Sequence, residues 1–288
     1  MSFSSEIKQE LNKTSNLSNK EIVKYELIGY LISGNIDEAI RNTIKFSTES
    51  DYNINRFSKL LTNLNINHNI EVSGKNFVIK LKVKDMEGKI PYKENLNEII
   101  NESKEEYLRA IVRGIFLGSG SINNPENKYH LEIVLKDETY LEKVTDLLKR
   151  MGVNAKKMIT KNKCSVYIKE GEEISRFLAL IGANKAVMSF EDIRIQKEMR
   201  GKVNRLVNCE AANLNKTINA SIEQIAAIKK LQQTGKFNKL DDNLKEIAIL
   251  RLENPNMSLV DLGKLLQQPV GKSGVNYRLK KIMEIANG

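Results

Sequence analysis

The stretch KYELIGYLISGNI (residues 24–36) returns later in the chain as LRAIVRGIFLGSGSI (108–122). The next helical pattern, RFSKLLTNLNIN (56–67), returns as KVTDLLKRMGVN (143–154), and the alternating run at 76–83 returns at 163–170. Matched positions are separated by 85 to 87 residues throughout. Self-similarity at a fixed period indicates repeated structural units. We therefore interpret the first two-thirds of the chain, residues 1–200, as a duplication with halves 1–103 and 104–200.

Hydrophobic periodicity gives the same order of elements in both halves. In the second half, apolar residues at helical spacing run from Leu108 to Phe116, and Leu131, Ile133 and Leu135 then alternate as in a half-buried strand. A helix at 141–151, strands at 153–159 and 164–168 and a closing helix through 174–181 follow. The first half predicts a helix at 20–33, a strand at 43–48, a helix at 51–65, strands at 67–73 and 76–83, and a helix at 93–102. With a short strand after each motif helix, each half is αββαββα, so the fold class is α+β.

This pattern resembles the LAGLIDADG homing endonucleases. The resemblance implies that the two motif helices pack together at a pseudo-twofold axis and that the sheets form a saddle for the DNA major groove. Gly29, Gly114 and Gly118 would let the helices approach closely, because glycine has no Cβ.

The acidic residues that such a nuclease needs are missing. The resemblance places a metal-binding carboxylate at the end of each motif helix, where Mg²⁺ would bind hard oxygen ligands. Ser119 stands at one of these positions, and in the other motif Ser33 precedes the glycine while Asp37 lies past it, out of register. We therefore expect no nuclease activity, no metal, no cofactor and no small-molecule substrate: the chain is not expected to be an enzyme.

Other enzyme signatures are weak. The GSGS run at 118–121 is neither of the glycine-rich phosphate-binding motifs and follows a helix. His130 lies in a strand pattern and is expected to be structural or at the surface, and His68 has no partner that the sequence reveals. Cys164 aligns with Phe77 of the first half, which favours a buried apolar role. Two cysteines cannot form a disulfide framework.

Charge points toward a polyanion, although the Lys-, Asn- and Ile-rich composition weakens that signal. The chain carries a net charge of +10, and its last 88 residues hold 14 basic and 8 acidic residues. The start of the chain has no apolar core of a signal peptide, and no run of apolar residues is long enough to span a membrane. We expect a cytoplasmic, nucleoid-associated protein with no membrane contact.

Residues 201–222 are expected to form a linker or connecting helix between two domains, and from Leu214 the spacing of Ile218, Ile222, Ile225 and Ile228 is helical again. Five of the sixteen residues from 204 to 219 are asparagine, and Arg205 and Lys216 lie among them. Asparagine forms helix poorly, so the segment could be a polar linker with frayed helix. Alternatively, it could contact phosphates or bases, which these side chains suit. The sequence leaves both alternatives open.

Residues 223–288 predict an all-α helix-turn-helix domain, with three helices between 239 and 286. The first stops before Pro255, the second opens with Ser258 as N-cap and Asp261 three residues later, and the third begins near Lys272. Val275, Leu279, Ile282 and Ala286 form the buried stripe of the third helix. The side chains left outward or on its flanks are Lys272, Ser273, Asn276, Tyr277, Arg278, Lys280 and Lys281.

A recognition helix contacts base edges with its N-terminal residues, which favours Lys272, Ser273 and Asn276 as readers. Asparagine pairs with adenine, and lysine or arginine binds guanine or phosphate. The domain resembles the helix-turn-helix of sigma-factor region four. The alternative is a three-helix bundle with a merely solvated polar face.

The combination of the two domains resembles the WhiA family. The opening SFSSEIKQEL, the run VNRLVNCEAANLNKTINA and the stretch PVGKSGVNYRLKKI all resemble that family's signatures. The resemblance implies a regulator that binds specific sequences of double-stranded DNA and acts in cell division, chromosome segregation or control of sporulation genes. It also allows an alternative, a protein-interaction module of the division machinery with a protein partner on the N-terminal domain and with DNA binding secondary.

Overall fold

The computed structural model describes residues 2–14, 17–39, 42–91, 96–161 and 163–288. Contacts within the chain divide it into two compact units, Met1–Glu198 and Met199–Gly288.

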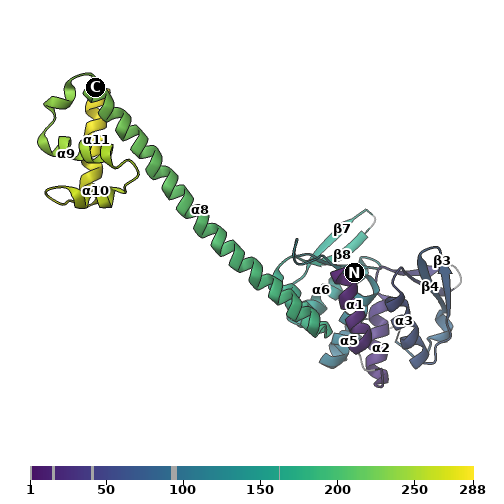
Figure 1. Cartoon of the computed structure of the whole chain (residues 1–288). Coiled ribbons are helices and arrows are strands. Elements are labelled where there is room, and N and C mark those ends of the chain that lie inside the picture. Colours follow the sequence, from purple (N-terminus) through teal and green to yellow (C-terminus); the bar gives the residue numbers. More distant parts are fainter. Residues whose placement is uncertain (1, 15–16, 40–41, 92–95, 162) are drawn as a thin grey trace. The chain divides into compact units, whose positions relative to one another are not determined.

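The first unit contains two copies of one set of elements, preceded by helix α1 (Phe3–Thr14) (Figure 1). The first copy consists of α2 (Lys20–Leu31), β1 (Ile36–Ala39), β2 (Thr43–Thr48), α3 (Asp51–Asn63), β3 (Asn69–Ser73), β4 (Asn76–Lys82), the 3-10 turn η1 (Val83–Asp85) and α4 (Leu96–Glu102). The second consists of α5 (Glu105–Ser119), β5 (Gly120–Ile122), β6 (Leu131–Leu135), α6 (Thr139–Arg150), β7 (Lys156–Thr160), β8 (Lys163–Ile168) and α7 (Gly171–Ile181). The predicted order is confirmed. The first three residues of the helix expected at 93–102 lie outside the described residues.

Sheet topology confirms the duplication. The first sheet has the order β1-β2-β4-β3 and the second the order β5-β6-β8-β7, with antiparallel pairing throughout. In β6, Leu131, Ile133 and Leu135 are buried while the residues between them are only partly covered. This alternation is the two-residue period of a strand with one face on the core. The turn before β1 contacts β6 of the other sheet, because the N–H of Gly34 donates to the carbonyl of Val134 at 2.9 Å.

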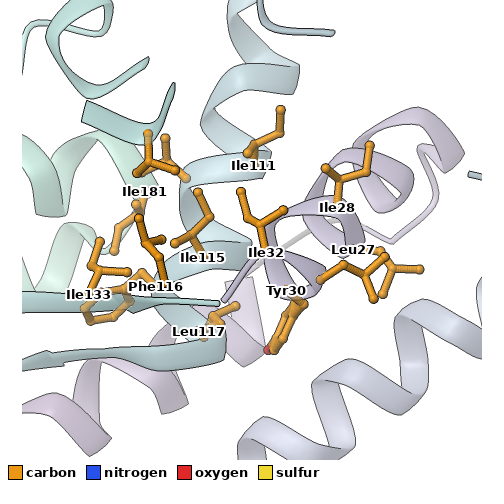
Figure 2. Close-up of a cluster of buried hydrophobic side chains, with 14 of the residues drawn as sticks. Leu27, Ile28, Tyr30, Ile32, Ile111, Ile115, Phe116, Leu117, Ile133 and Ile181 are labelled. Atoms are coloured by element: carbon orange, nitrogen blue, oxygen red, sulfur yellow. The ribbon is translucent and has the colours of Figure 1, made fainter. Parts of the chain in front are cut away.

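Glycines bring the motif helices α2 and α5 into backbone contact. A Cβ on Gly29 would lie 2.2 Å from the carbonyl oxygen of Ile111, and one on Gly114 would lie 2.0 Å from that of Glu26. A Cβ on Gly118 would lie 2.3 Å from the hydroxyl of Ser33. Figure 2 shows the apolar side chains of both helices gathered around this contact. The expected role of the three glycines at the helix pair is confirmed.

A charged cluster also lies at this helix pair. The Glu26 side chain is fully buried, and its two oxygens accept hydrogen bonds from Nε and Nη2 of Arg56 at 2.7 and 2.9 Å. Nε of Arg113, on α5, donates to the same carboxylate at 2.9 Å. The cluster therefore ties α2 to both α3 and α5.

Helix α8 (Asn184–Gln233) is continuous over 50 residues. Its first turn is capped from α1, because the carboxylate of Glu10 accepts the backbone N–H groups of Lys185 and Ala186 at 2.8 and 3.1 Å. Residues 201–222 are helical throughout. The segment is therefore a connecting helix and shows none of the fraying that its asparagines suggested, because cooperative helix formation between two anchored ends outweighs their low helix propensity.

The second unit packs the end of α8 against the turn η2 (Lys236–Lys239) and helices α9 (Asp242–Glu253), α10 (Leu259–Leu265) and α11 (Lys272–Asn287). Its own apolar core includes Ile228, Ile247, Leu262 and Leu279. Ser258 caps α10 as predicted, because its hydroxyl accepts the N–H of Asp261 at 3.2 Å. In the part of the chain that the structure describes, no helix has the length and apolar character needed to cross a membrane.

Candidate nucleic-acid interface

Helix α11 carries most of the side chains predicted to bind DNA. Its buried stripe is Val275, Leu279, Ile282 and Ala286, as the sequence predicts. The remaining candidates lie off this stripe. Lys272, Ser273, Tyr277, Lys280 and Lys281 are exposed, and Asn276 and Arg278 are half-buried.

The first turns of α11 combine basic charge with unoccupied backbone donors. The N-cap is Gly271, and no side chain caps the helix there. The first acidic residue of the helix is Glu284, in its fourth turn. Free N–H groups and the helix dipole favour an anion at this end. Lys272 and Ser273 lie in the first turn, and Asn276 follows Lys272 by four residues on the same side.

A close turn sets the position of α11 relative to α10. The backbone N–H of Val270 donates to the carbonyl of Gly263 at 3.1 Å. A Cβ on Gly263 would lie 2.1 Å from the carbonyl oxygen of Val270, so this helix position requires glycine. The two helices of the motif are thereby held together through backbone contact.

Arg251 holds the loop before α10, a role that the sequence analysis missed. Its side chain is buried, and Nη1 donates to the carbonyl of Met257 at 2.8 Å and that of Pro255 at 3.3 Å. Burial lowers the pKa of its guanidinium. The sequence did contain a signal for this role: Arg251 stands at an otherwise apolar position of the α9 pattern, four residues before Pro255.

Lys281 lies apart from the first turn of α11. It lines a hollow of about 440 Å³ together with Lys236 and Lys239 of η2, and the other lining residues include one acid, Asp241, and the apolar Leu240 and Ile285. No pattern in the sequence sets Lys236 and Lys239 apart from other lysines. Three lysines around one hollow suit contact with a phosphate better than base reading, because a lysine ammonium is a point charge.

Arg205 and Lys216 lie on α8 and are exposed. Both belong to the second unit. They are eleven residues apart, so they face the same direction on a regular helix.

In the first unit, the ends of the motif helices are joined by neutral side chains. The Ser119 hydroxyl donates to the backbone carbonyl of Val134, and the Ser33 hydroxyl donates to the backbone carbonyl of Tyr30 at 2.7 Å. The Asn35 amide donates across the helix pair to the carbonyl of Gly118 at 2.7 Å. Asp37 lies on β1, opposite Lys45. Among the described residues, no three His, Cys, Asp or Glu side chains group together as metal ligands would.

Three further side chains that the sequence offers as candidate catalytic or reactive groups have ordinary structural surroundings. His130 lies beside the ring of Tyr167, with centroids 6.1 Å apart. His68 bonds through Nε2 to the hydroxyl of Ser58 at 2.7 Å. Cys164 is buried, and this burial raises the pKa of its thiol.

Several lysines of the two sheets face carboxylates. Lys163 contacts Glu132 at 2.7 Å and Lys80 contacts Glu71 at 2.6 Å. Burial raises the pKa of Glu132, but hydrogen bonds from Lys163 and Ser165 outweigh this effect and hold that pKa below its usual value. These pairs reduce the positive potential that the sheets present.

Comparison with known proteins covers both units. The family model for the WhiA LAGLIDADG-like domain matches residues 108–200, and the model for the WhiA C-terminal HTH domain matches residues 203–286. The "Probable cell division protein WhiA" of Clostridium novyi is 38% identical over 99% of this chain and 98% of its own length. The protein of the same name from Clostridium tetani is 38% identical over 99% of this chain and 97% of its own length.

Solved structures give the same result. The crystal structure of "full-length DUF199/WhiA from Thermatoga maritima" is similar over 100% of this chain and 98% of that one, with 30% identity and a TM-score of 0.64. The crystal structure of the N-terminal LAGLIDADG domain of DUF199/WhiA covers 63% of this chain and 92% of its own, with 30% identity and a TM-score of 0.54.

Proposed function

This chain belongs to the WhiA family, and on that premise we propose that it is a regulator that binds specific sequences of double-stranded DNA and acts in cell division. The names of its relatives support the connection with cell division. The proposal extends to chromosome segregation and the control of sporulation genes, and it places the protein at the nucleoid.

The first two turns of α11 carry this proposal. They present Lys272, Ser273 and Asn276 without a neighbouring acid, at a helix end that favours anions. In a helix-turn-helix domain, this end of the second helix reads base edges in the major groove. Asn276 would pair with adenine in a bidentate way, and Lys272 would bind guanine or phosphate.

The other basic side chains are assigned to the backbone of the DNA. Arg278, Lys280 and Lys281 lie later in the helix, and Tyr277, directly before them, is 67% exposed. Lys281 shares its hollow with two further lysines. Contacts of this kind fix the register of a protein on the duplex but carry no sequence information.

The experiment compares two α11 variants against a duplex selected from a random library by the full-length protein. Asn276→Ala should weaken binding to the selected duplex by about 1–3 kcal/mol and relax the preference at one base position. Lys281→Ala should weaken binding to all sequences alike and flatten its salt dependence. Equal effects of the two substitutions on selected and random duplexes would refute these roles.

We further propose that the protein does not cleave DNA. Cleavage by two metal ions requires carboxylates at the scissile phosphates, and the helix ends present Ser33, Asn35 and Ser119 instead. Supercoiled plasmid should stay intact with Mg²⁺ or Mn²⁺ at an excess of protein over plasmid. Nicking that chelation of the metal abolishes would overturn this part of the proposal.

A second candidate function concerns the first unit. Its sheet lysines contact carboxylates at several positions, which favours a protein partner over DNA on this unit. In this alternative the chain is an interaction module of the division machinery, and DNA binding is secondary. If cells that carry the double variant Lys272→Ala with Asn276→Ala still divide normally, that result would support this alternative.

A further inference from the structure

The middle of α8 contains a repeat of eleven residues. VNRLVNCEAAN (203–213) is followed at once by LNKTINASIEQ (214–224), so that Asn204 matches Asn215, Arg205 matches Lys216 and Asn208 matches Asn219. Eleven residues make about three turns of helix and about 16 Å of rise. Matched residues therefore face the same way, and the repeat builds one continuous surface along the helix.

That surface is polar, small and basic, and we call it the amide face. Its members follow one another at spacings that keep them on one side of a helix. They are Asn204, Arg205, Asn208, Ala211, Ala212, Asn215, Lys216 and Asn219. Between residues 199 and 222 the sequence has one acidic residue, Glu210. Glu210 follows Asn208 by two positions, which places it on the opposite side of the helix.

The amide face is open within the second unit. All eight members are exposed, and the contacts of α8 with the core of this unit begin at Ser221, whose hydroxyl donates to the carbonyl of Pro255 at 2.5 Å. Of the large apolar side chains that are also exposed, Val203, Leu206 and Leu214 lie on the other side of the helix, whereas Ile222 lies at the end of the amide face. The two sides thus differ in chemistry.

Helix stability does not account for the asparagines. Asparagine costs up to about 0.7 kcal/mol relative to alanine in a helix interior, whereas an ordinary exposed helix favours glutamate, lysine and glutamine. Asparagines at 204, 208, 215 and 219 therefore weaken the helix that carries them. Their placement on one face indicates a role in contact with another molecule.

We propose that the amide face is a second DNA-reading surface, which lies along the major groove of a duplex. This inference rests on the proposed DNA-binding function and adds a second element to it. The major groove is about 12 Å wide and admits a helix. Asparagine pairs with adenine, alanine contacts the thymine methyl group, and arginine or lysine binds guanine or phosphate. Ala211 and Ala212, at the centre of the face, let the helix backbone approach the bases.

The chemistry of the amide face favours DNA over a protein helix as its partner. A partner helix would pack on a stripe of apolar side chains, and along 203–214 these (Val203, Leu206 and Leu214) lie on the other side of the helix. The amide face offers hydrogen-bond donors and acceptors at regular spacing, with its two basic residues about 16 Å apart.

The test uses the full-length protein and a duplex selected from a random-sequence library. The double variant Asn208→Ala with Asn215→Ala should bind the selected duplex on the order of 5- to 150-fold more weakly and lose preference at the affected bases. Alanine strengthens the helix, so unfolding cannot explain the loss. The matched control is Asn213→Ala, an exposed asparagine off the amide face whose amide contacts the sulfur of Cys209 at 3.8 Å; it should bind within about twofold of wild type.

Salt dependence tests the basic pair separately. The double variant Arg205→Ala with Lys216→Ala should reduce the slope of log affinity against log salt by about 2, one for each phosphate contact. Asn213→Ala, which lies off the amide face on the same helix, should leave the slope unchanged. A slope that is also unchanged in the double variant would contradict the proposed contacts.

Variants of α11 separate this inference from the function on which it rests. If Asn276→Ala weakens binding while the asparagine pair at 208 and 215 behaves like Asn213→Ala, the amide face does not read DNA and the proposed function stands. If the α11 and α8 variants all bind DNA as wild type does, both proposals are wrong. If the α8 pair alone weakens binding, α8 reads the DNA and the role proposed for α11 is wrong.

Discussion

Glu26 occupies a helix position whose neighbours on the same face are Val23 and Tyr30, both buried. The buried carboxylate is stabilised there because Arg56 donates to both of its oxygens and Arg113 donates to one of them. A buried charge is tolerated only with such partners. An acid at an apolar position of the pattern was a visible signal, but its partners lie 30 and 87 residues away, so the sequence could not reveal them.

Breaking this cluster should destabilise the first unit strongly. Arg56→Met leaves the Glu26 carboxylate buried with one partner, and we expect a loss of about 3–5 kcal/mol in the free energy of unfolding. The control is Arg109→Met, which removes the exposed pair with Glu105 and should cost at most about 1 kcal/mol. Urea unfolding of both variants measures the difference, and equal losses would contradict the account.

The glycines of the helix pair make a second residue-level prediction. Gly114→Ala should lower the melting temperature, because the added Cβ meets the backbone of α2 and overpacking costs about 1–3 kcal/mol or more. Gly201→Ala, also in a helix interior, meets only Nη1 of Arg205 at 3.6 Å and should stabilise its helix by about 0.5–1 kcal/mol. Thermal unfolding that shows the same sign for both variants would count against close packing of α2 and α5.

The two cysteines should differ in reactivity. Cys164 is buried with a raised thiol pKa, whereas Cys209 is exposed on α8. The thiolate is the reactive form, so at pH 8 Cys209 should be alkylated first and Cys164 only at higher pH or on unfolding. Mass spectrometry after timed treatment with iodoacetamide measures this order. Faster labelling of Cys164 would place it outside the core.

At the scale of elements, local periodicity predicts the fold well. The apolar spacing of α5 and the alternation of β6 are visible in the local sequence alone. Because the two halves are duplicated, the element order predicted for one half can be tested against the other. Helix α8 is the exception. The low propensity of asparagine predicts fraying, but the cap from Glu10 and the packing of Ile228 anchor the two ends. Such anchors are tertiary contacts, which local propensity does not contain.

Arg251 should stabilise the loop between α9 and α10. Arg251→Met leaves loop carbonyls without a donor, and we expect a loss of about 1–3 kcal/mol in this unit. Because the loop precedes α10 and α10 holds α11, DNA affinity should also fall although Arg251 does not touch DNA. Hydrogen exchange of the amides at 254–262 measures the loosening. Unchanged exchange in this segment would show that other contacts hold the loop.

At the scale of the whole molecule, charge is divided unequally between the two units. The last 88 residues hold six more basic than acidic residues, and the sheets of the first unit pair lysines with carboxylates. The sequence alone could place the basic excess in the second unit. It could not show which lysines are paired, because β-strand register brings Lys163 and Glu132 together across 31 residues.

The central claim is that residues 199–288 bind DNA without help from the first unit. The salt dependence of binding to fragmented genomic DNA tests it most directly, with the full-length protein compared with residues 199–288, which contain their own apolar core. The slope of log affinity against log salt counts the phosphates that the protein neutralises. We predict the same steep slope for both. A clearly steeper slope for the full-length protein would show that the first unit also contacts DNA, and would contradict this account.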